Sequence, residues 1–184
     1  MLLGTYTATW IKDFTEIKCE IENGMRGIDY TIEHVGSTSV PNLDSKPIID
    51  IDIIYSHLAD FEKIKSGLRK MGYDHHGNQG IEGREVFKRN GIGHHEILDT
   101  IIHHLYVCPV DSQALERHIL SRDFLRKNDW ARLKYQQMKY DMAEKANQDR
   151  KKYQALKEQY INDFIDSIIA EEKRIRNTEI SIVQ

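Results

Sequence analysis

The chain has 184 residues, of which 40% are hydrophobic and 30% are charged, as is typical of one globular domain with an ordinary core. The formal net charge of −3 gives no overall attraction to nucleic acid, so a site for a polyanion would have to be local. No apolar run approaches the ~18–20 residues of a membrane span and the N-terminus lacks a secretory signal pattern, so no membrane partner is expected.

The N-terminal part predicts a helix followed by a strand. Apolar side chains recur at helical spacing from Trp10 to Ile21, and Gly24 is expected to end this helix. Residues 30–35 predict a strand that leads into a short, hydroxyl-rich turn. Such a turn lets backbone N–H groups approach an anion closely. It consists of Gly36, Ser37, Thr38 and Ser39.

Two carboxylates lie on the next predicted strand. Residues 48–54 are Ile throughout except for Asp50 and Asp52. Because side chains alternate between the faces of a strand, both aspartates point to one face, about 6–7 Å apart. Two carboxylates at this spacing are costly to bury unless a cation lies between them. The pair therefore predicts a metal site, which suits a metal-bound nucleoside triphosphate; a surface pair is the alternative.

Further elements follow from the same kinds of pattern. Residues 58–71 carry apolar side chains at helical spacing and predict a second helix. Residues 73–83, rich in Gly, His, Asn and Asp, predict a loop. Strands are expected at residues 84–89 and 97–107, with Ile101 to Val107 the strongest part.

The C-terminal part predicts helices only. Asp111 or Ser112 is expected to cap the first of them, and residues 171–184 predict a charged, irregular tail. The order of elements predicts an α+β fold, a small mixed sheet flanked by helices with a C-terminal helical extension. Residues 1–110 would form the α/β core and residues 111–184 the helical part of the same domain.

The stretch from His34 to Asp52 resembles a signature of the GrpB family, which lies in the polymerase beta-like nucleotidyltransferase superfamily. The family's run is His-Val/Ile-Gly-Ser-Thr-Ser-Val-Pro-Gly-Leu-x-x-Lys-Pro-Ile-Ile-Asp-Ile, and Asn42 departs from it where the family usually has Gly. Residues 122–126 are similar to the family's Phe-Arg-Asp-Tyr-Leu-Arg element. The likeness extends over roughly residues 10–170 and implies a nucleotidyltransferase-like core. The matching residues of the first run are Gly36, Ser37, Thr38, Ser39, Pro41, Leu43, Lys46, Pro47 and Asp50.

The resemblance implies a nucleotidyltransferase that depends on Mg²⁺ (or Mn²⁺). It would move a nucleoside monophosphate from a nucleoside triphosphate to a small-molecule acceptor, whose identity is left open along with the base preference. Asp50 and Asp52 would be the catalytic metal ligands, because carboxylates can bridge two metal ions that neutralise the triphosphate and assist in-line attack. The predicted nucleotide- and phosphate-binding residues are Gly36, Ser37, Thr38, Ser39, Lys46, Arg84 and Arg122.

Superfamily enzymes usually carry a third carboxylate on a later strand. This sequence leaves its identity open among Glu85, Glu96 and Asp99. The GrpB family instead shows a His-Leu-His element on the last strand, where this chain has His104-Leu105-Tyr106, so the first imidazole is kept and the second is not. Further candidates for the site are His34, Glu85 and His104.

Zinc is disfavoured by the spacing of its usual ligands. The nine histidines include three adjacent pairs, but neighbouring strand residues face opposite ways and cannot chelate one ion. No His-x-x-x-His or Cys-x-x-Cys spacing occurs. The two cysteines, Cys19 and Cys108, are isolated thiols that predict a reducing, cytoplasmic location.

Two functions remain in competition. The first is the metal-dependent nucleotidyltransferase. The second is a non-catalytic protein with a degenerate nucleotidyltransferase fold that binds a nucleotide or a phosphorylated metabolite, favoured by the open third carboxylate and by Tyr106 in place of His. Nucleic acid is not expected as a partner, and a homo-oligomer is compatible with the sequence.

Overall fold

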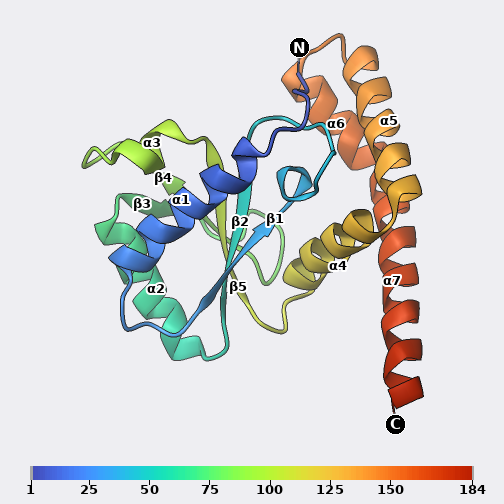
Figure 1. The fold of residues 1–184 in the computed structure, drawn as a ribbon. Helices are drawn as coiled ribbons and strands as arrows, with labels where there is room; N and C mark the ends of the chain where they lie inside the picture. The colour runs from blue at the N-terminus through green and yellow to red at the C-terminus, as the bar shows by residue number, and fades with distance from the viewer. Residues whose placement is uncertain (1, 184) are drawn as a thin grey trace.

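The computed structural model describes the backbone of residues 2–183. Helices and strands alternate up to residue 109 and only helices follow (Figure 1). The elements are α1 (Thr9–Gly24), β1 (Thr31–Val35), the short 3-10 helix η1 (Ser37–Ser39), β2 (Ile49–Tyr55), α2 (Leu58–Lys70), β3 (Tyr73–His75), β4 (Glu85–Arg89), α3 (Glu96–Thr100), β5 (His103–Pro109), α4 (Gln113–Lys127), α5 (Asp129–Lys145), α6 (Arg150–Tyr160) and α7 (Asn162–Val183).

A five-stranded mixed sheet forms the centre of the fold, in the strand order β1-β2-β5-β4-β3. β2 and β5 pair in parallel, and the other neighbours pair antiparallel. The strand that carries both aspartates is therefore central. Asp50 lies opposite His104 and Asp52 lies opposite Tyr106. Because directly paired residues point to the same face, these four side chains share one face of the sheet.

The opposite face of the sheet is apolar and is covered by α1 and α2. Ile49, Ile51 and Ile53 belong with Leu105 and Val107 to one buried cluster. Each such side chain contributes roughly 1.5–3 kcal/mol by leaving water. The alternation predicted for residues 48–54 is thus confirmed, and the apolar stripe of α1 packs here as expected. The α1 and α2 members of the cluster are Trp10, Ile17, Ile21, Ile64 and Leu68.

A second apolar core lies among the C-terminal helices. Phe124, Tyr135 and Phe164 are among its members, and Leu3 and Leu43 join it from the N-terminal half of the chain. α4 lies between this core and the sheet, where it contacts β1 and β5. The face of the sheet that carries the aspartates therefore looks toward the second core. The helices of that core are on the right of Figure 1.

The predicted α+β fold, with a small mixed sheet, flanking helices and a C-terminal helical extension, is confirmed. Three expectations about single elements are wrong. The predicted loop at residues 73–83 begins with a strand, β3; the predicted strand at residues 97–107 begins with a helix, α3; and the irregular tail predicted from residue 171 continues as α7 to Val183.

Tertiary contacts explain these differences. Tyr73 is buried and β3 pairs with β4, so a polar stretch becomes a strand at the sheet edge. His95 caps α3 by accepting a hydrogen bond from the Leu98 N–H at 3.4 Å. Glu172 in α7 is buried and pairs with Lys127 of α4 at 3.0 Å, which holds the charged C-terminal helix against the body.

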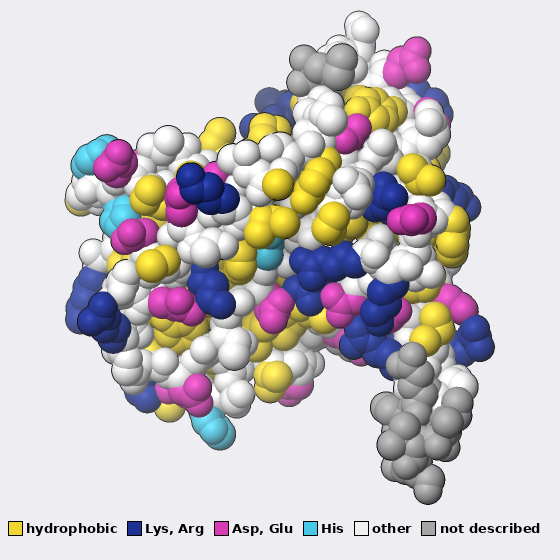
Figure 2. Space-filling view, in the orientation of Figure 1, with side chains coloured by type: hydrophobic (Ala, Val, Ile, Leu, Met, Phe, Trp, Pro, Cys, Tyr) yellow, Lys and Arg dark blue, Asp and Glu magenta, His cyan; other side chains and the backbone are white. Residues whose placement is uncertain are grey.

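Charged side chains of both signs are mixed along the boundary between the two halves on the face shown in Figure 2. Ion pairs join α4 to α7, including Asp123 with Arg176 at 2.9 Å and Glu116 with Lys173 at 2.7 Å. Among the helices of residues 2–183, none has the length and the apolar composition that a membrane span requires.

Candidate functional site

The polar face of the sheet forms the floor of a large cleft. Its volume is about 1310 Å³, above the roughly 300–1,000 Å³ of most small-molecule sites. The floor includes Asp50, His104 and Tyr106, while α4, α5 and α6 supply the other walls. Cations gather in these walls. They include Lys46, Arg84, Arg117, Lys139, Arg150 and Lys157.

Asp50 is the carboxylate on the floor of this cleft, and Asp99, paired with Arg89, also lines it. The side chain of Asp50 is 29% exposed, and its Oδ1 accepts a hydrogen bond from Nδ1 of His104 at 2.9 Å. β5 supplies that histidine at the register position directly opposite Asp50. The predicted pair of candidates, Asp50 and His104, is thus brought into direct contact at the floor of the cleft.

Gly36 presses the predicted phosphate-binding turn against Asp50. The residue has φ 70° and ψ −172°, a region that is essentially restricted to glycine. A Cβ atom at this position would lie 2.3 Å from Oδ2 of Asp50. Backbone and carboxylate therefore approach more closely here than any other residue type allows.

Replacing Gly36 with Ala is expected to lower the free energy of unfolding by about 3 kcal/mol, because backbone strain and a steric clash add. Gly91→Ala is the matched control, since Gly91 has a similar φ of 72° but no atom within 4 Å of its Cβ position. That control should cost only about 1 kcal/mol. Urea denaturation of both variants measures the difference, and equal losses would refute the close approach to Asp50.

Asp52 has a different environment. Its side chain is fully buried, and its Oδ2 accepts a hydrogen bond from Nδ1 of His118 at 2.8 Å. Its Oδ1 is buried without a hydrogen-bond partner in the described part of the chain. Both aspartates share one face of β2 as predicted, but only Asp50 meets a ligand in the cleft directly. A metal-binding role for Asp52 stays a prediction.

The four-residue turn divides between the cleft and the interior. Gly36 and Ser37 line the cleft. Thr38 and Ser39 are buried, and their hydroxyls bond internally, to the Ile48 carbonyl at 3.2 Å and to the Gly36 carbonyl at 2.6 Å. The geometry therefore leaves Gly36 and Ser37 available to a phosphate, while the other two hydroxyls hold the shape of the turn.

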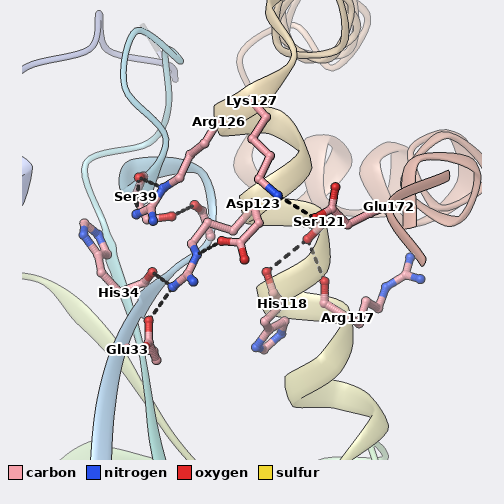
Figure 3. A network of polar contacts seen from close by, with 12 residues as sticks. Glu33, His34, Ser39, Arg117, His118, Ser121, Asp123, Arg126, Lys127 and Glu172 are labelled. Carbon is pink, nitrogen blue, oxygen red and sulfur yellow. Dashed lines mark hydrogen bonds and ion pairs between the residues drawn. The ribbon is translucent and has the colours of Figure 1, made fainter. Parts of the chain in front are cut away.

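Two arginines of α4 reach the segments around the turn. Arg126 projects from α4 toward Ser39 (Figure 3), and Arg122 contacts β1 at His34. Arg122 pairs with Glu33 and Asp123 and also donates to the His34 carbonyl at 3.0 Å. Arg126 donates to the Ser39 carbonyl from two nitrogens, at 3.0 and 2.8 Å. The two guanidiniums thus hold the site together, and the charge of Arg122 is already matched by carboxylates.

Lys46 and Arg84 remain exposed to the cleft. Nζ of Lys46 lies 4.3 Å from the centre of the Tyr153 ring, and the guanidinium of Arg84 lies 4.5 Å from that of Tyr106. Nε of Arg84 is buried with no hydrogen-bond partner among the described residues. Ring faces position both cations without neutralising them, which suits groups that meet an anion.

Two candidates lie away from the cleft floor. His34 pairs with Ile51 on the apolar face of the sheet, stacks on Phe14 and contacts the Thr38 hydroxyl at 3.1 Å. Burial lowers its pKa to about 4, and Arg126 adds to this shift, so His34 is a neutral structural group at pH 7. Glu85 lies opposite Val107, on the same apolar face, and pairs with His75.

The third carboxylate that the resemblance led us to expect on a later strand does not lie on β5 beside the aspartates. On β5, the neighbour of β2, the two residues that face the aspartates are His104 and Tyr106. Asp99 pairs with Arg89, and it lies with Glu96 in α3. Asp99 lines the cleft but its charge is paired with Arg89, whereas Glu85 and Glu96 do not line the cleft.

The side chains around Asp50 do not by themselves form a metal site. Within the described residues, no group of three His, Cys, Asp or Glu side chains is arranged to hold a metal ion. Mg²⁺, however, is commonly held by one or two carboxylates together with the phosphates of a substrate. The accessible Asp50 and the unpartnered Oδ1 of Asp52 fit a cation that arrives with a polyphosphate, and do not form a preassembled metal site.

Sequence reasoning missed three residues of this region. His118, Lys139 and Glu33 all contact predicted site elements. His118 lies on a helix without a motif around it, so only the fold reveals it. Lys139, with Tyr135, is similar to a Tyr-x-x-Leu-Lys element of the GrpB family, but its contact with Asp44 follows only from the fold. Glu33 could have been predicted, because it is next to His34 in the first predicted strand and therefore faces the opposite side of the sheet.

Fold and site together define a small α+β protein whose central strand presents a carboxylate to a cation-lined cleft. A sequence profile described as GrpB protein matches residues 2–167. The chain belongs to the GrpB family, which confirms the resemblance seen in residues 34–52.

Individual relatives agree with this assignment. The chain is 30% identical over 169 residues to glutamate-rich protein GrpB of Alkalihalophilus pseudofirmus, covering 91% of this chain and 95% of that protein. It is 28% identical to UPF0157 protein YqkA of Bacillus subtilis, covering 97% of this chain but spanning only 50% of that protein's length. The crystal structure of GrpB from Enterococcus faecalis superimposes with a TM-score of 0.74 at 26% identity, over 92% of this chain and 98% of that one.

Structural similarity to nucleotidyltransferases is weak. Structures of the Cid1 poly(U) polymerase match 66% of this chain with TM-scores of 0.42 and 0.44 at 10% identity. Likeness at this level does not support an inference about activity, so function has to be argued from the cleft itself.

Proposed function

We propose that the cleft binds a nucleoside triphosphate together with Mg²⁺ (or Mn²⁺) and transfers its nucleotidyl group to a small-molecule acceptor. The observation that carries this proposal is the accessible carboxylate of Asp50 at the centre of a cleft walled by lysines and arginines. The carboxylate of Asp50 would repel phosphates locally, unless a divalent cation joins the two.

Five residues of the cleft have a defined role in this proposal. Asp50 is the anchoring ligand, and His104 orients it through the 2.9 Å contact. Gly36 and Ser37 line the cleft beside Asp50 and would contact a phosphate, and Arg84 supplies a charge that no carboxylate in the described chain neutralises. When bound, Mg²⁺ supplies positive charge that offsets the triphosphate.

The transfer itself balances simply. A hydroxyl oxygen of the acceptor forms a bond to the α-phosphorus, and the bond from that phosphorus to the oxygen of the pyrophosphate group breaks. Pyrophosphate leaves and the acceptor proton passes to solvent. The part of the protein is to hold both reactants in line and to stabilise charge on the phosphate oxygens.

A second function is favoured by one specific observation. The cleft floor carries His104 and Tyr106 where a third carboxylate would face Asp50, and Asp52 is buried. A protein that binds a nucleotide or phosphorylated metabolite without turning it over needs the cations but not the third carboxylate. Both functions predict binding, and only the first predicts release of pyrophosphate.

Binding is tested by titrating ATP, GTP, CTP and UTP into the protein by calorimetry, in Mg²⁺ and in EDTA. At least one triphosphate is expected to bind about tenfold more tightly with Mg²⁺, or about 1.4 kcal/mol, because the carboxylate of Asp50 otherwise repels the phosphates. Asp50→Asn should remove most of this dependence. Asp29→Asn, an exposed carboxylate outside the cleft, is the control. Equal affinity in EDTA for wild type would contradict the proposal.

A further inference from the structure

One end of the cleft is built from basic residues of three segments. This lysine end consists of Lys46 from the segment before β2, Lys139 from α5, and Arg150, Lys151 and Lys157 from α6. Lys139 is 3% exposed and its Nζ donates to the Asp44 carbonyl. Such a buried ammonium group is rare in proteins unless a counter-charge is present.

The counter-charge is missing from the described chain. No carboxylate among the described residues lies within ion-pair distance of Lys46, Lys139 or Arg150, and the partner of Lys139 is a neutral carbonyl. Burial, together with nearby Lys157, lowers the pKa of Lys139 to about 7, although Asp44 and Asp50 act in the opposite direction. Burial, Lys157 and Arg150 likewise lower the pKa of Lys46. Three cations of the lysine end, Lys46, Lys139 and Arg150, therefore have no paired carboxylate in the described chain.

Asp50 lies near both this end and a second cation, Arg84. It acts electrostatically on Lys46 and Lys139, and it also adds to burial in raising the pKa of Tyr106. Arg84 covers the ring of Tyr106 at 4.5 Å. The cleft thus holds two groups of cations near Asp50, and its 1310 Å³ exceeds what one small ligand usually fills.

We propose that the lysine end binds the phosphate group of the second substrate, so that the acceptor is a phosphorylated small molecule. Its role as acceptor rests on the proposed function. Binding of a phosphate group at the lysine end does not, because it needs neither Asp50 nor a metal ion.

Calorimetric titration with glycerol 3-phosphate and with inorganic phosphate, in EDTA at pH 7, tests this site in the full chain. At least one probe is expected to bind wild type, and Lys46→Gln and Lys139→Met should each weaken binding at least about tenfold. Lys152→Gln is the matched control, because Lys152 lies on α6 outside the cleft. Asp50→Asn should bind as well as wild type or better. No binding to wild type, or equal loss in the control, would overturn the proposal.

Competition separates an acceptor site from a site for the triphosphate itself. With a non-hydrolysable triphosphate analogue and Mg²⁺ already bound, the phosphate probe is expected to bind with its affinity changed less than threefold. Mutual displacement would overturn the assignment to a second substrate. Since these titrations involve no turnover, a failure to release pyrophosphate would count against the proposed function and leave this site standing.

Proton uptake is a further signature of Lys139. The groups that face it are Asp44, Lys46, Asp50 and Lys157. A bound phosphate favours the ammonium form, so binding at pH 8 should take up close to one proton, measured as the dependence of the calorimetric heat on the buffer's ionisation heat. Lys139→Met should abolish this uptake. Unchanged uptake in that variant would overturn the placement of the phosphate beside Lys139.

Discussion

Replacing Lys139 with Met is expected to stabilise the ligand-free protein at pH 7 by about 2 kcal/mol. The lysine pKa falls to about 7 because the side chain is buried, whereas in the unfolded chain it stays near 10.5. A fall of this size corresponds to an upper limit of roughly 5 kcal/mol. Loss of the hydrogen bond to the Asp44 carbonyl and imperfect packing of Met reduce the net gain.

The sign of the pH dependence follows from the same shift. Below pH 7 the lysine is charged in both states, and the full cost of burying its charge opposes folding. Between pH 7 and 10.5 the unfolded chain binds more protons than the native protein, so the stability of wild type rises with pH. The advantage of Lys139→Met should therefore shrink toward pH 10.

Urea denaturation of wild type and Lys139→Met at pH 7 and pH 10 measures both effects. Lys134→Met provides the control, since Lys134 lies exposed on the same helix and should change stability by less than about 0.5 kcal/mol. A variant less stable than wild type at pH 7 would show that Lys139 supports the fold through its contact with Asp44.

The period-2 alternation of β2 is the reason that so much of the cleft floor could be predicted. Asp50 between Ile49 and Ile51 can only face away from the apolar core, whichever strands flank it. The turn before the strand was predictable for a similar reason, because only glycine suits the backbone of Gly36 beside a carboxylate. The local sequence pattern was therefore enough to predict β2 and the turn before it.

Other parts of the site depend on contacts between distant segments. His118 meets Asp52 from 66 residues away, and Lys139 meets Asp44 from 95 residues away. No spacing rule within one sequence links such positions. The sequence alone could not place His34 and Glu85 on the apolar face of the sheet, because the register between strands decides their position. β3 and α3 are short, and tertiary pairing and a side-chain cap override their weak local preference.

Substituting Asp50 with Asn is expected to lower nucleotidyl transfer by at least about 10²-fold, the size of effect seen when a group that stabilises transition-state charge is removed. Asn keeps the shape of the side chain and can still accept the hydrogen bond from His104. It cannot anchor a cation with a full negative charge. The loss should therefore appear in turnover, while the fold and the lysine end stay intact.

Pyrophosphate release tests the proposed nucleotidyl transfer directly. Wild type, Asp50→Asn and the control Asp29→Asn are incubated with Mg²⁺, each nucleoside triphosphate and a filtered pool of cellular metabolites. Wild type and Asp29→Asn are expected to release pyrophosphate, and Asp50→Asn is expected to release it at least about 10²-fold more slowly. Release that Asp50→Asn leaves unchanged, or wild type that binds the nucleotide without any release, would contradict the proposed transfer.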